Sequence, residues 1–393
     1  MTKISDKLWN RAGAMRVPLT GAFELLPICN LNCKMCYVRK SPAEVEQLGG
    51  LIPAEQWLDW ARQARDAGML YPLLTGGEPF VRQDFFEIYA GMQEMGLQIS
   101  INSNGTLITE EIAKWLGKHR PVRINITLYG GSEQTYENLC GNGDAFRRVH
   151  QSVEWLRQYG VPVKFNASIT PENVHDLTAM MEFAKSVGSP IQVATYMFPP
   201  VRRDERMIGQ NHRLSPEEAG HARVEADWLQ SEPEWFMGQA ARYRTFVPLE
   251  EALQQAKETG EPKEMGCRAG RCSFWLDWQG NIANCGMYPS VRFPMEGQSF
   301  ADAWKQVVDQ TEAVRYASVC TTCPNYRLCH PCIAMVYNET GVLDGRPEYL
   351  CRMNAASAKY YQEYARRLPE YQKIAEQIPF ESAEGCALED IGL

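Results

Sequence analysis

Cys29-Asn-Leu-Asn-Cys33-Lys-Met-Cys36-Tyr37 is the stretch from which the fold and the chemistry of this chain can be worked out. Three thiols at these spacings can converge on one metal centre, but a structural zinc ion takes four protein ligands and a disulfide framework needs an even number of cysteines. An iron–sulfur cluster held by three thiolates keeps one iron with a vacant position, where a substrate or cofactor can bind. The alternative is three buried cysteines with no metal.

The composition is that of an ordinary soluble globular protein of 393 residues, of which 45% are hydrophobic and 22% charged. This length predicts two or three structural units. The formal net charge of −8 argues against a general nucleic-acid-binding protein, and no window approaches the eighteen apolar residues that would span a membrane. Thirteen cysteines without an N-terminal secretory signal indicate a reducing, cytoplasmic compartment and metal binding in place of disulfide bonds.

Strands and helices are predicted to alternate along the first half of the chain. The strands are expected at residues 17–26, 69–74, 97–102, 122–128, 161–168 and 191–197, and helices at 53–64, 84–95, 109–118, 132–139, 145–159 and 173–186. Six such units with short connections predict a parallel sheet with helices outside it, and they are too few to close an eight-stranded barrel. We therefore expect an α/β fold with an open, partial (β/α)6 barrel, whose chemistry lies at the carboxyl ends of the strands.

The sequence changes character after the sixth strand. Ser215-Pro-Glu-Glu218 is a capping box that predicts the start of a helix, and residues 231–266 form a bridge with scattered aromatic side chains. Cysteines return after residue 266, and the acidic end of the chain carries Cys386. We expect an N-terminal arm or short helix (1–16), the barrel (17–214), a helical bridge (215–266), a small cysteine-rich domain (267–365) and a surface tail (366–393).

The spacing Cys29-x3-Cys33-x2-Cys36 resembles the signature of the radical S-adenosylmethionine enzymes. The resemblance implies a [4Fe–4S] cluster whose open iron binds the amino and carboxylate groups of the cofactor's methionine. An electron from the cluster then cleaves S-adenosylmethionine, and the 5′-deoxyadenosyl radical abstracts a hydrogen atom from the substrate. Met35 stands where the family usually has an aromatic residue against the adenine, and its thioether can also lie against a ring.

The same resemblance implies further cofactor-binding residues. Gly76-Gly77-Glu78-Pro79, directly after the second strand, is similar to the motif that binds the methionine's ammonium group. Thr127, near the end of the fourth strand, is the candidate for the ribose; the alternative is a threonine chosen for its strand propensity. Ser103 and Met197, near the ends of the third and sixth strands, complete the predicted set.

The carboxylate of the cofactor lacks its usual partner in this sequence. Many relatives carry an arginine in the helix after the fourth strand, but residues 132–142 contain no Arg or Lys. We expect an arginine from the 202–213 loop to take this role; the alternative is that the loop is a solvated basic surface.

Eight cysteines in the C-terminal part make up two sets of four. Two structural zinc sites are one interpretation, because the pairs at 320/323 and 329/332 have the spacing of zinc knuckles. The whole pattern, with Gly280 before Cys285, more closely resembles the SPASM domain, which carries two auxiliary clusters. The resemblance implies two groups of ligands, namely Cys267, Cys272, Cys285 and Cys332 for one [4Fe–4S] cluster, and Cys320, Cys323, Cys329 and Cys351 for the other.

Cys140 is left over at a helix end. A thiol near a radical site could donate a hydrogen atom to the substrate, as in peptide epimerases. The simpler interpretation is a small buried hydrophobic residue.

Proteins that pair these two domains mostly modify peptides or proteins, and this implies an oxidoreductase that makes an oxidative change, such as a crosslink, in a ribosomally made peptide. Alternatives are a peptide epimerase, a sulfatase-type formylglycine maturase or a small-molecule radical dehydrogenase. Gly286 counts against the sulfatase group, which typically has an aspartate there. An electron-transfer iron–sulfur protein would leave the open triplet without a purpose. The expected partners are the peptide substrate and an electron donor such as a flavodoxin or ferredoxin, with no nucleic acid and no membrane.

Overall fold

The computed structural model describes residues 4–256, 263–264, 266–289, 291–316 and 318–368. Within them, one sheet contains nine strands in the order β10-β9-β8-β1-β2-β3-β4-β5-β6. The first six strands are parallel to one another, as predicted. They are β1 (Thr20–Glu24), β2 (Tyr71–Thr75), β3 (Ser100–Ser103), β4 (Arg123–Leu128), β5 (Val163–Ser168) and β6 (Ile191–Ala194).

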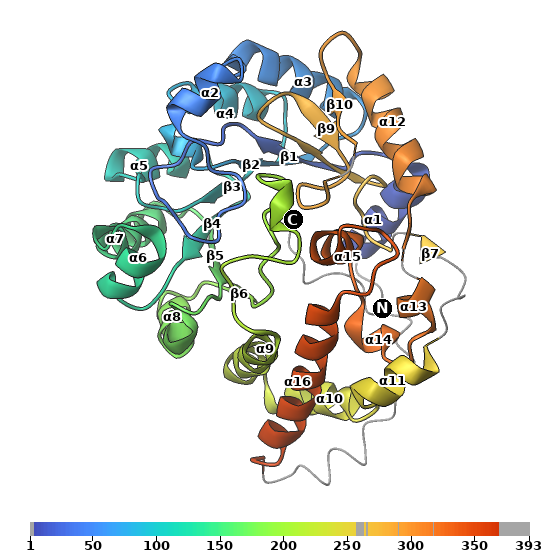
Figure 1. The fold of residues 1–393 in the computed structure, drawn as a ribbon. Helices are drawn as coiled ribbons and strands as arrows, with labels where there is room; N and C mark the ends of the chain where they lie inside the picture. The colour runs from blue at the N-terminus through green and yellow to red at the C-terminus, as the bar shows by residue number, and fades with distance from the viewer. Residues whose placement is uncertain (1–3, 257–262, 265, 290, 317, 369–393) are drawn as a thin grey trace.

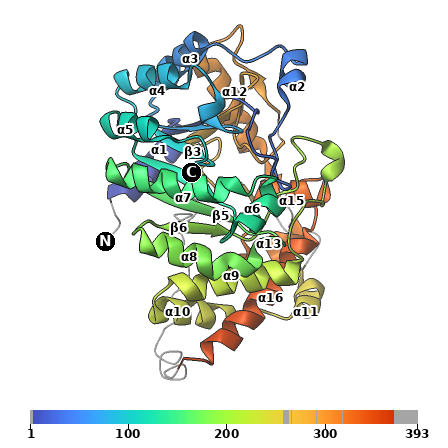
Figure 2. The same ribbon diagram turned by 90° about the vertical axis from the view of Figure 1, so that its left-hand side faces the viewer.

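The helices of the barrel follow its strands and cover the outer face of the curved sheet (Figure 2). Five of its six strands begin one to three residues after the predicted starts, and β6 begins at the predicted residue. The predicted helix at 173–186 is split into a 3-10 turn η2 (Val174–Asp176) and α8. The helices are α3 (Ala54–Asp66), α4 (Phe85–Glu94), α5 (Glu110–Lys118), α6 (Glu133–Cys140), α7 (Asp144–Gln158) and α8 (Leu177–Ser186), with α1 (Ile4–Met15) in the N-terminal arm and α2 (Pro42–Gln47) after the cysteine loop.

The two faces of the sheet differ in polarity because side chains alternate along each strand. On the outer face, Ile101, Ile124, Ile126 and Phe165 are completely buried under the helices. The opposite face carries polar side chains that are half-buried or buried. These inward positions are Asn102, Asn125, Thr127, Lys164, Asn166, Ser168 and Gln192. The inner face of the open barrel is therefore polar, which suits a charged cofactor or a hydrogen-bonding substrate.

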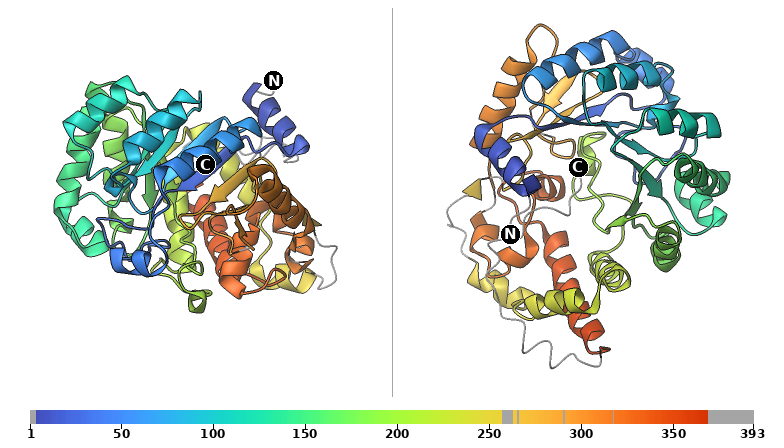
Figure 3. Two further views of the ribbon diagram at one scale, coloured as in Figure 1. Left: turned by 90° about the horizontal axis from the view of Figure 1, so that it is seen from above. Right: turned by 180° about the vertical axis from the view of Figure 1, so that it is seen from behind.

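The cysteine-rich part extends the barrel sheet past β1. Strand β8 (Ser273–Leu276) pairs in parallel with β1, and β9 (Asn281–Ala283) and β10 (Phe293–Pro294) continue the sheet in antiparallel pairs. Figures 1 and 3 show β9 and β10 beside β1, with the red helix near the end of the chain across the open side of the barrel from the sheet. The region predicted as a separate domain thus begins as a continuation of the barrel.

Helices make up most of the rest of the chain. The bridge contains α9 (Pro216–Gln230), whose capping box at Ser215 is present as predicted, α10 (Pro233–Tyr243) and α11 (Leu249–Gln255). The long α16 (Glu348–Ala365) packs against α9 and α10. The other elements are η1 (Pro79–Val81), η3 (Glu205–Met207), α12 (Phe300–Ala313), α13 (Ser318–Thr322), α14 (Tyr326–Cys329), α15 (Ile333–Thr340) and the short pair β7 (Lys263–Glu264) and β11 (Arg315–Tyr316).

In the part of the chain that the structure describes, no helix has both the length and the apolar character needed to cross a membrane. Cys386 and most of the predicted surface tail lie outside the described residues.

Candidate functional site

The cysteine loop follows β1 and is held by the end of α6. The N–H groups of Asn32 and Lys34, on either side of Cys33, donate to the carbonyl oxygens of Cys140 and Leu139 at 3.0 and 3.1 Å. The last carbonyls of a helix have no partner within the helix itself. Here they fix the backbone around the central cysteine.

The three thiols of this loop are half-buried and lie within electrostatic reach of one another. The N–H groups of Leu31 and Arg39 donate to the sulfur atoms of Cys29 and Cys36 at 3.4 and 3.3 Å. Burial nevertheless raises the pKa of Cys29 to about 12 and raises the pKa of Cys36. These two thiols therefore stay protonated at neutral pH until a metal centre deprotonates them.

The arrangement of these donors distinguishes a cluster from a single ion. Within the described residues, no three cysteine, histidine or acidic side chains gather at the spacing of a mononuclear site. An iron–sulfur cluster is several atoms wide, so its ligands lie farther apart than those of one ion. Three thiols on one loop, with N–H groups directed at two of the sulfur atoms, fit a cluster with one open iron.

A network of amides and a hydroxyl joins the cysteine loop to the end of β3. Asn104 donates from Nδ2 to Asn30 Oδ1 at 2.9 Å and contacts Cys29 Sγ at 3.6 Å. Thr106 donates its hydroxyl to Asn104 Oδ1 at 2.6 Å and accepts from Asn30 Nδ2 at 2.8 Å. Asn104 was not among the residues predicted from the sequence; the signal that could have found it is the polar turn after the third strand.

Two glycines let the segment after β2 pack on the segment after β1. Gly76 has a φ of 146°, and a Cβ atom on Gly77 would lie 2.3 Å from the carbonyl oxygen of Ile28. The N–H groups of Gly77 and Glu78 donate to the carbonyls of Leu26 and Ile28 at 2.7 and 3.0 Å. A side chain at either glycine would separate the two segments, so this approach requires both glycines.

Glu78 is fully buried beside this contact, and three protein donors hold its carboxylate. Ser103 Oγ donates at 2.9 Å, the N–H of Asn104 at 2.7 Å and the N–H of Phe80 at 3.2 Å. Burial raises the pKa of Glu78 to about 7, although the three hydrogen bonds act in the other direction. The carboxylate therefore fixes the ends of β2 and β3 relative to each other.

The other predicted cofactor residues follow the strand ends. Met35 is half-buried against the main core, and Thr127 is half-buried on the inner face of β4. Pro79 begins η1, Ser103 ends β3 and Met197 follows β6, and all three are buried. Their contacts with a cofactor stay predictions.

The arginines of the 202–213 loop differ in what they contact. Arg203 is exposed and donates to the carbonyl oxygen of Cys36 at 2.9 Å. Arg213 forms a buried ion pair with Glu339 on α15 and lies 3.8 Å above the ring of Tyr349. Arg203 is thus hydrogen-bonded to the backbone of the cysteine loop, and a contact between an arginine of this loop and the cofactor carboxylate stays a prediction.

Arg202 forms a second buried pair, which connects the barrel to the cysteine-rich part. It pairs with Glu24 at the end of β1 at 2.5 Å and donates to the carbonyl oxygen of Gly286 at 3.0 Å. Glu24 also accepts from Trp275 Nε1 at 2.9 Å. The guanidinium lies 5.7 Å from the ring centre of Tyr37. Arg202 is thus positioned between the residue after Cys36 and the residue after Cys285.

An ion-paired group of three side chains lies on the outer side of the cysteine loop. Glu172 accepts from Lys34 at 2.7 Å and from His212 Nε2 at 2.6 Å. Burial alone would raise the pKa of Glu172, but the hydrogen bonds from Lys34 and His212 lower it to about 2. The carboxylate is therefore ionised at neutral pH, and it ties the loop to the segments after β5 and β6.

Residues 23–184, which contain the cysteine triplet and the Gly-Gly-Glu motif, match the Radical SAM superfamily. This part of the chain is a radical SAM domain. Members of this superfamily use S-adenosylmethionine (AdoMet) and a [4Fe–4S] cluster, and the open partial barrel predicted from the sequence is confirmed.

Relatives of more than one kind are similar to this sequence. An AdoMet-dependent heme synthase of Methanosarcina barkeri is 26% identical over 81% of this radical SAM chain and 92% of its own length. A PqqA peptide cyclase of Bradyrhizobium diazoefficiens is 24% identical, with 46% of each chain covered.

Two solved structures share the fold. The Streptococcus suis SuiB structure bound to precursor peptide SuiA has a TM-score of 0.62 at 16% identity and covers 89% of this chain and 82% of its own. The anSMEcpe structure with bound AdoMet has a TM-score of 0.62 at 17% identity, covering 92% and 100%.

The C-terminal cysteines of this radical SAM enzyme form two groups. Cys267, Cys285 and Cys332 lie within electrostatic reach of one another and share one hydrophobic cluster. Cys272, which was predicted to join them, is fully buried elsewhere and packs with Ala12 of α1. The structure therefore brings three of these four predicted ligands together.

The second group has all four of its predicted members. Electrostatic contacts connect Cys320, Cys323, Cys329 and Cys351. All are half-buried, and burial raises the pKa of Cys320 to about 12 and that of Cys351 to about 11. α14 ends at Cys329 and α16 contributes Cys351 from its first turn, so two helix ends converge on this group.

Cys140 contacts a predicted cluster ligand. Its side chain is 1% exposed and hydrogen-bonds with Cys33, which lowers the pKa of Cys33. Hydrogen-atom donation to a substrate would require an exposed thiol, so this geometry favours the simpler interpretation of Cys140 as a buried residue.

Proposed function

We propose that this radical SAM enzyme oxidises a ribosomally made peptide, and that it carries three [4Fe–4S] clusters. Cys29, Cys33 and Cys36 would hold the cluster that binds S-adenosylmethionine. The two C-terminal groups would hold auxiliary clusters, with Cys272 left out of the first. When bound, S-adenosylmethionine supplies the 5′-deoxyadenosyl radical, and the auxiliary clusters supply an acceptor for the electron that the substrate gives up.

The chain's own residues would orient the cofactor around the cysteine loop. Because Glu78 is fully buried, the contact with the cofactor ammonium falls mainly to the backbone carbonyls of Gly76 and Gly77, which Glu78 positions. Arg203 is our candidate for the carboxylate, and Thr127 for the ribose. The polar inner face of the barrel would bind the peptide by hydrogen bonds.

The observation that carries this proposal is the connection between the cysteine loop and the first C-terminal group. Arg202 contacts both the segment of Glu24 and Gly286, next to Cys285. A substrate in the open barrel would therefore lie between the site that starts the reaction and a site that can accept an electron. Net oxidation of the substrate needs both of these sites. Abstraction of a hydrogen atom followed by return of a hydrogen atom needs only the site that starts the reaction.

Mass spectrometry of a candidate peptide tests this function. The peptide encoded beside the gene is incubated without oxygen with the enzyme, S-adenosylmethionine and a reductant. We expect a loss of two hydrogens, one as the abstracted atom and one as a proton with its electron. An unchanged mass in H₂O together with the gain of one deuterium in D₂O would instead indicate an epimerase.

A heme precursor is the second candidate substrate. The match to the heme synthase extends over 92% of that protein, against 46% of the peptide cyclase. The same assay with a heme precursor in place of the peptide distinguishes the two. Turnover of the precursor while no peptide reacts would overturn the peptide proposal.

A further inference from the structure

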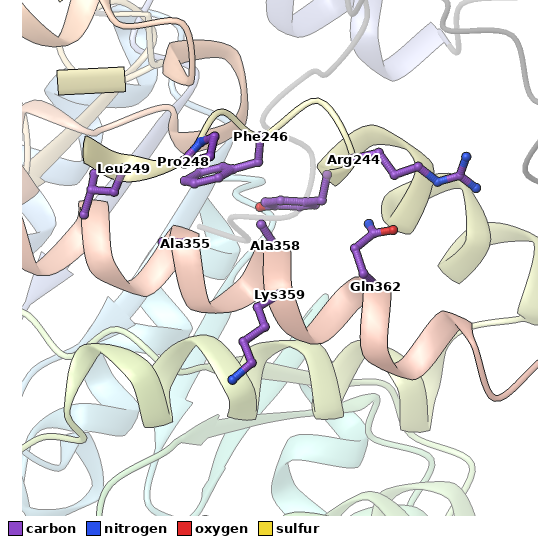
Figure 4. A pocket seen from close by; sticks show the side chains of 9 residues that line it. Arg244, Phe246, Pro248, Leu249, Ala355, Ala358, Lys359 and Gln362 are labelled. Carbon is purple, nitrogen blue, oxygen red and sulfur yellow. The ribbon is translucent and has the colours of Figure 1, made fainter. Parts of the chain in front are cut away.

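A pocket of about 500 Å³ lies between the bridge and α16, outside the barrel (Figure 4). Its apolar lining comes from Tyr243, Phe246 and Leu249 of the bridge and from Ala355 and Ala358 of α16. Figure 4 shows the bridge residues stacked over one face of α16. Pockets of this volume accommodate a few side chains of a partner.

Cationic side chains surround this apolar centre. Arg244 and Lys359 are exposed, and Figure 4 shows them extending outward on opposite sides. Arg327 is also exposed, and its carbonyl oxygen accepts from Arg242 at 2.8 Å. Of the residues that line the pocket, the charged ones are Arg244 and Lys359; the acidic residues on neighbouring turns, Glu250 and Glu251 of α11 and Glu363 of α16, do not line it. In a chain with a net charge of −8, this cationic rim favours a partner whose contact face is acidic.

The wall of the pocket is joined directly to the second cysteine group. Asn325, between Cys323 and Cys329, donates from Nδ2 to the carbonyl oxygen of Val247 at 2.8 Å and accepts from its N–H at 2.8 Å. Val247 belongs to the turn that lines the pocket. The bridge is therefore fastened to the cysteine-bearing loop at this point.

Two lining residues bring the pocket close to the cysteines themselves. Ala355 follows Cys351 by four residues of α16, which is about 6 Å along a helix axis. Tyr243 lies within electrostatic reach of Cys329. A protein seated on this pocket would thus contact residues that adjoin the second cysteine group.

We propose that this surface, defined by Tyr243, Arg244, Phe246, Leu249 and Lys359, docks a small acidic electron-carrier protein that exchanges one electron with the second auxiliary site. The inference rests on the proposed function, because that oxidation leaves an electron on the auxiliary sites. One electron would pass to the oxidised carrier, which restores the auxiliary site for the next turnover. Redox encounters use small contact areas, so the surface need not be large.

Stopped-flow mixing of dithionite-reduced enzyme with an oxidised flavodoxin tests the proposal. The variant is Arg244→Glu/Lys359→Glu, and the matched control is Lys114→Glu/Arg157→Glu, which reverses two exposed charges on α5 and α7. We expect the rate constant for flavin reduction to fall at least about tenfold in the variant at low salt, and the difference to vanish near 1 M salt. Direct binding of flavodoxin should weaken in parallel.

The result that overturns the proposal is an equal rate constant and affinity in the variant and the control. Iron content and reduction by dithionite report on folding. Both properties should equal those of the wild type in the variant and in the control. If removal of residues 369–393 changes carrier binding while charge reversal does not, the acidic end of the chain occupies the pocket and the proposal fails. Peptide oxidation with a chemical oxidant tests the proposed function separately, so the two failures are distinguishable.

Discussion

The two cysteine-bearing regions of this enzyme are built in different ways. The triplet at Cys29, Cys33 and Cys36 lies on one loop, and hydrogen bonds from neighbouring backbone and side chains surround it. The C-terminal groups draw their thiols from segments far apart in sequence, such as Cys267 and Cys332. The first arrangement depends on local sequence, and the second depends on how the bridge and α16 pack. The ligands of the triplet can therefore be assigned from sequence spacing, while those of the C-terminal groups require the tertiary structure.

Removal of the three thiols of the triplet should show the largest difference in iron binding between the two regions. In Cys29→Ala/Cys33→Ala/Cys36→Ala, about four of about twelve irons should be lost, since each proposed cluster holds four. The C-terminal region packs through its own helices and should keep the remaining iron. Iron and sulfide analysis after anaerobic reconstitution measures this. Loss of all iron, or zinc bound in the C-terminal region, would contradict the assignment.

The buried Arg213–Glu339 pair should matter most for holding the C-terminal region on the barrel. Arg213→Met leaves a buried carboxylate without its partner, which costs about 3–5 kcal/mol of unfolding free energy. The control is Arg352→Met, which removes an exposed pair with Glu217 and should cost about 0–1 kcal/mol. Urea unfolding of both variants gives the comparison. Similar losses would show that the buried pair has no special role.

The pH dependence of stability should report the burial of Glu78 in the barrel. Its pKa in the folded state, about 7, exceeds the ordinary 4.5, so the folded protein holds this proton more tightly than the unfolded chain. The resulting stabilisation is complete below about pH 4.5 and is lost as the pH rises through 7, on the order of 3 kcal/mol. Unfolding of cluster-free wild type and Glu78→Gln at pH 5 and 7.5 should therefore give diverging values. Parallel pH profiles would exclude this titration.

The same substitution should weaken cofactor binding without loss of iron. In Glu78→Gln, an amide N–H₂ group would face a donor at Ser103 or Asn104, which displaces the ends of β2 and β3 and with them the carbonyls of Gly76 and Gly77. Loss of one charge-assisted hydrogen bond between these carbonyls and the ammonium group is worth about 1.5–3 kcal/mol, so affinity for S-adenosylmethionine should fall at least about tenfold. Glu87→Gln, on the exposed side of α4, is the control. Unchanged affinity would remove Glu78 from the site.

Cys272→Ala should have the smallest effect, and it tests the grouping of the C-terminal thiols. Because Cys272 packs against Ala12 and away from the other three cysteines, its removal should leave the iron content unchanged. Cys267→Ala should lose about a third of the iron. Equal losses from the two variants would restore the four-thiolate assignment implied by the resemblance.

Much of the barrel could be predicted from the sequence because its signals are local. Alternating apolar segments located the six strands. The Gly76-Gly77 pair was predicted as part of the ammonium site, and its close packing on the segment after β1 became visible only in the structure. Strands β8 to β10 escaped prediction because they are two to four residues long and are stabilised by pairing with β1 and with each other. Short strands carry too few alternating residues for a pattern.

Prediction of the functional-site residues was also limited to what local sequence can show. Spacing grouped Cys272 with its sequence neighbour Cys267, but packing beneath α1 separates them. Asn104 could not be singled out, because an asparagine in a turn has an ordinary explanation until its contact with Cys29 is seen. Glu78 was predicted as an open carboxylate partner, and its full burial became visible only with the ends of β2 and β3 in place.

The release of 5′-deoxyadenosine from two variants, measured side by side without substrate, tests most directly whether the two regions have different roles. Cys29→Ala/Cys33→Ala/Cys36→Ala should release none, because the proposed site of cofactor cleavage is gone. Cys285→Ala/Cys332→Ala should still release it in the presence of dithionite, since its triplet is intact. Equal loss of 5′-deoxyadenosine in both variants would contradict the account.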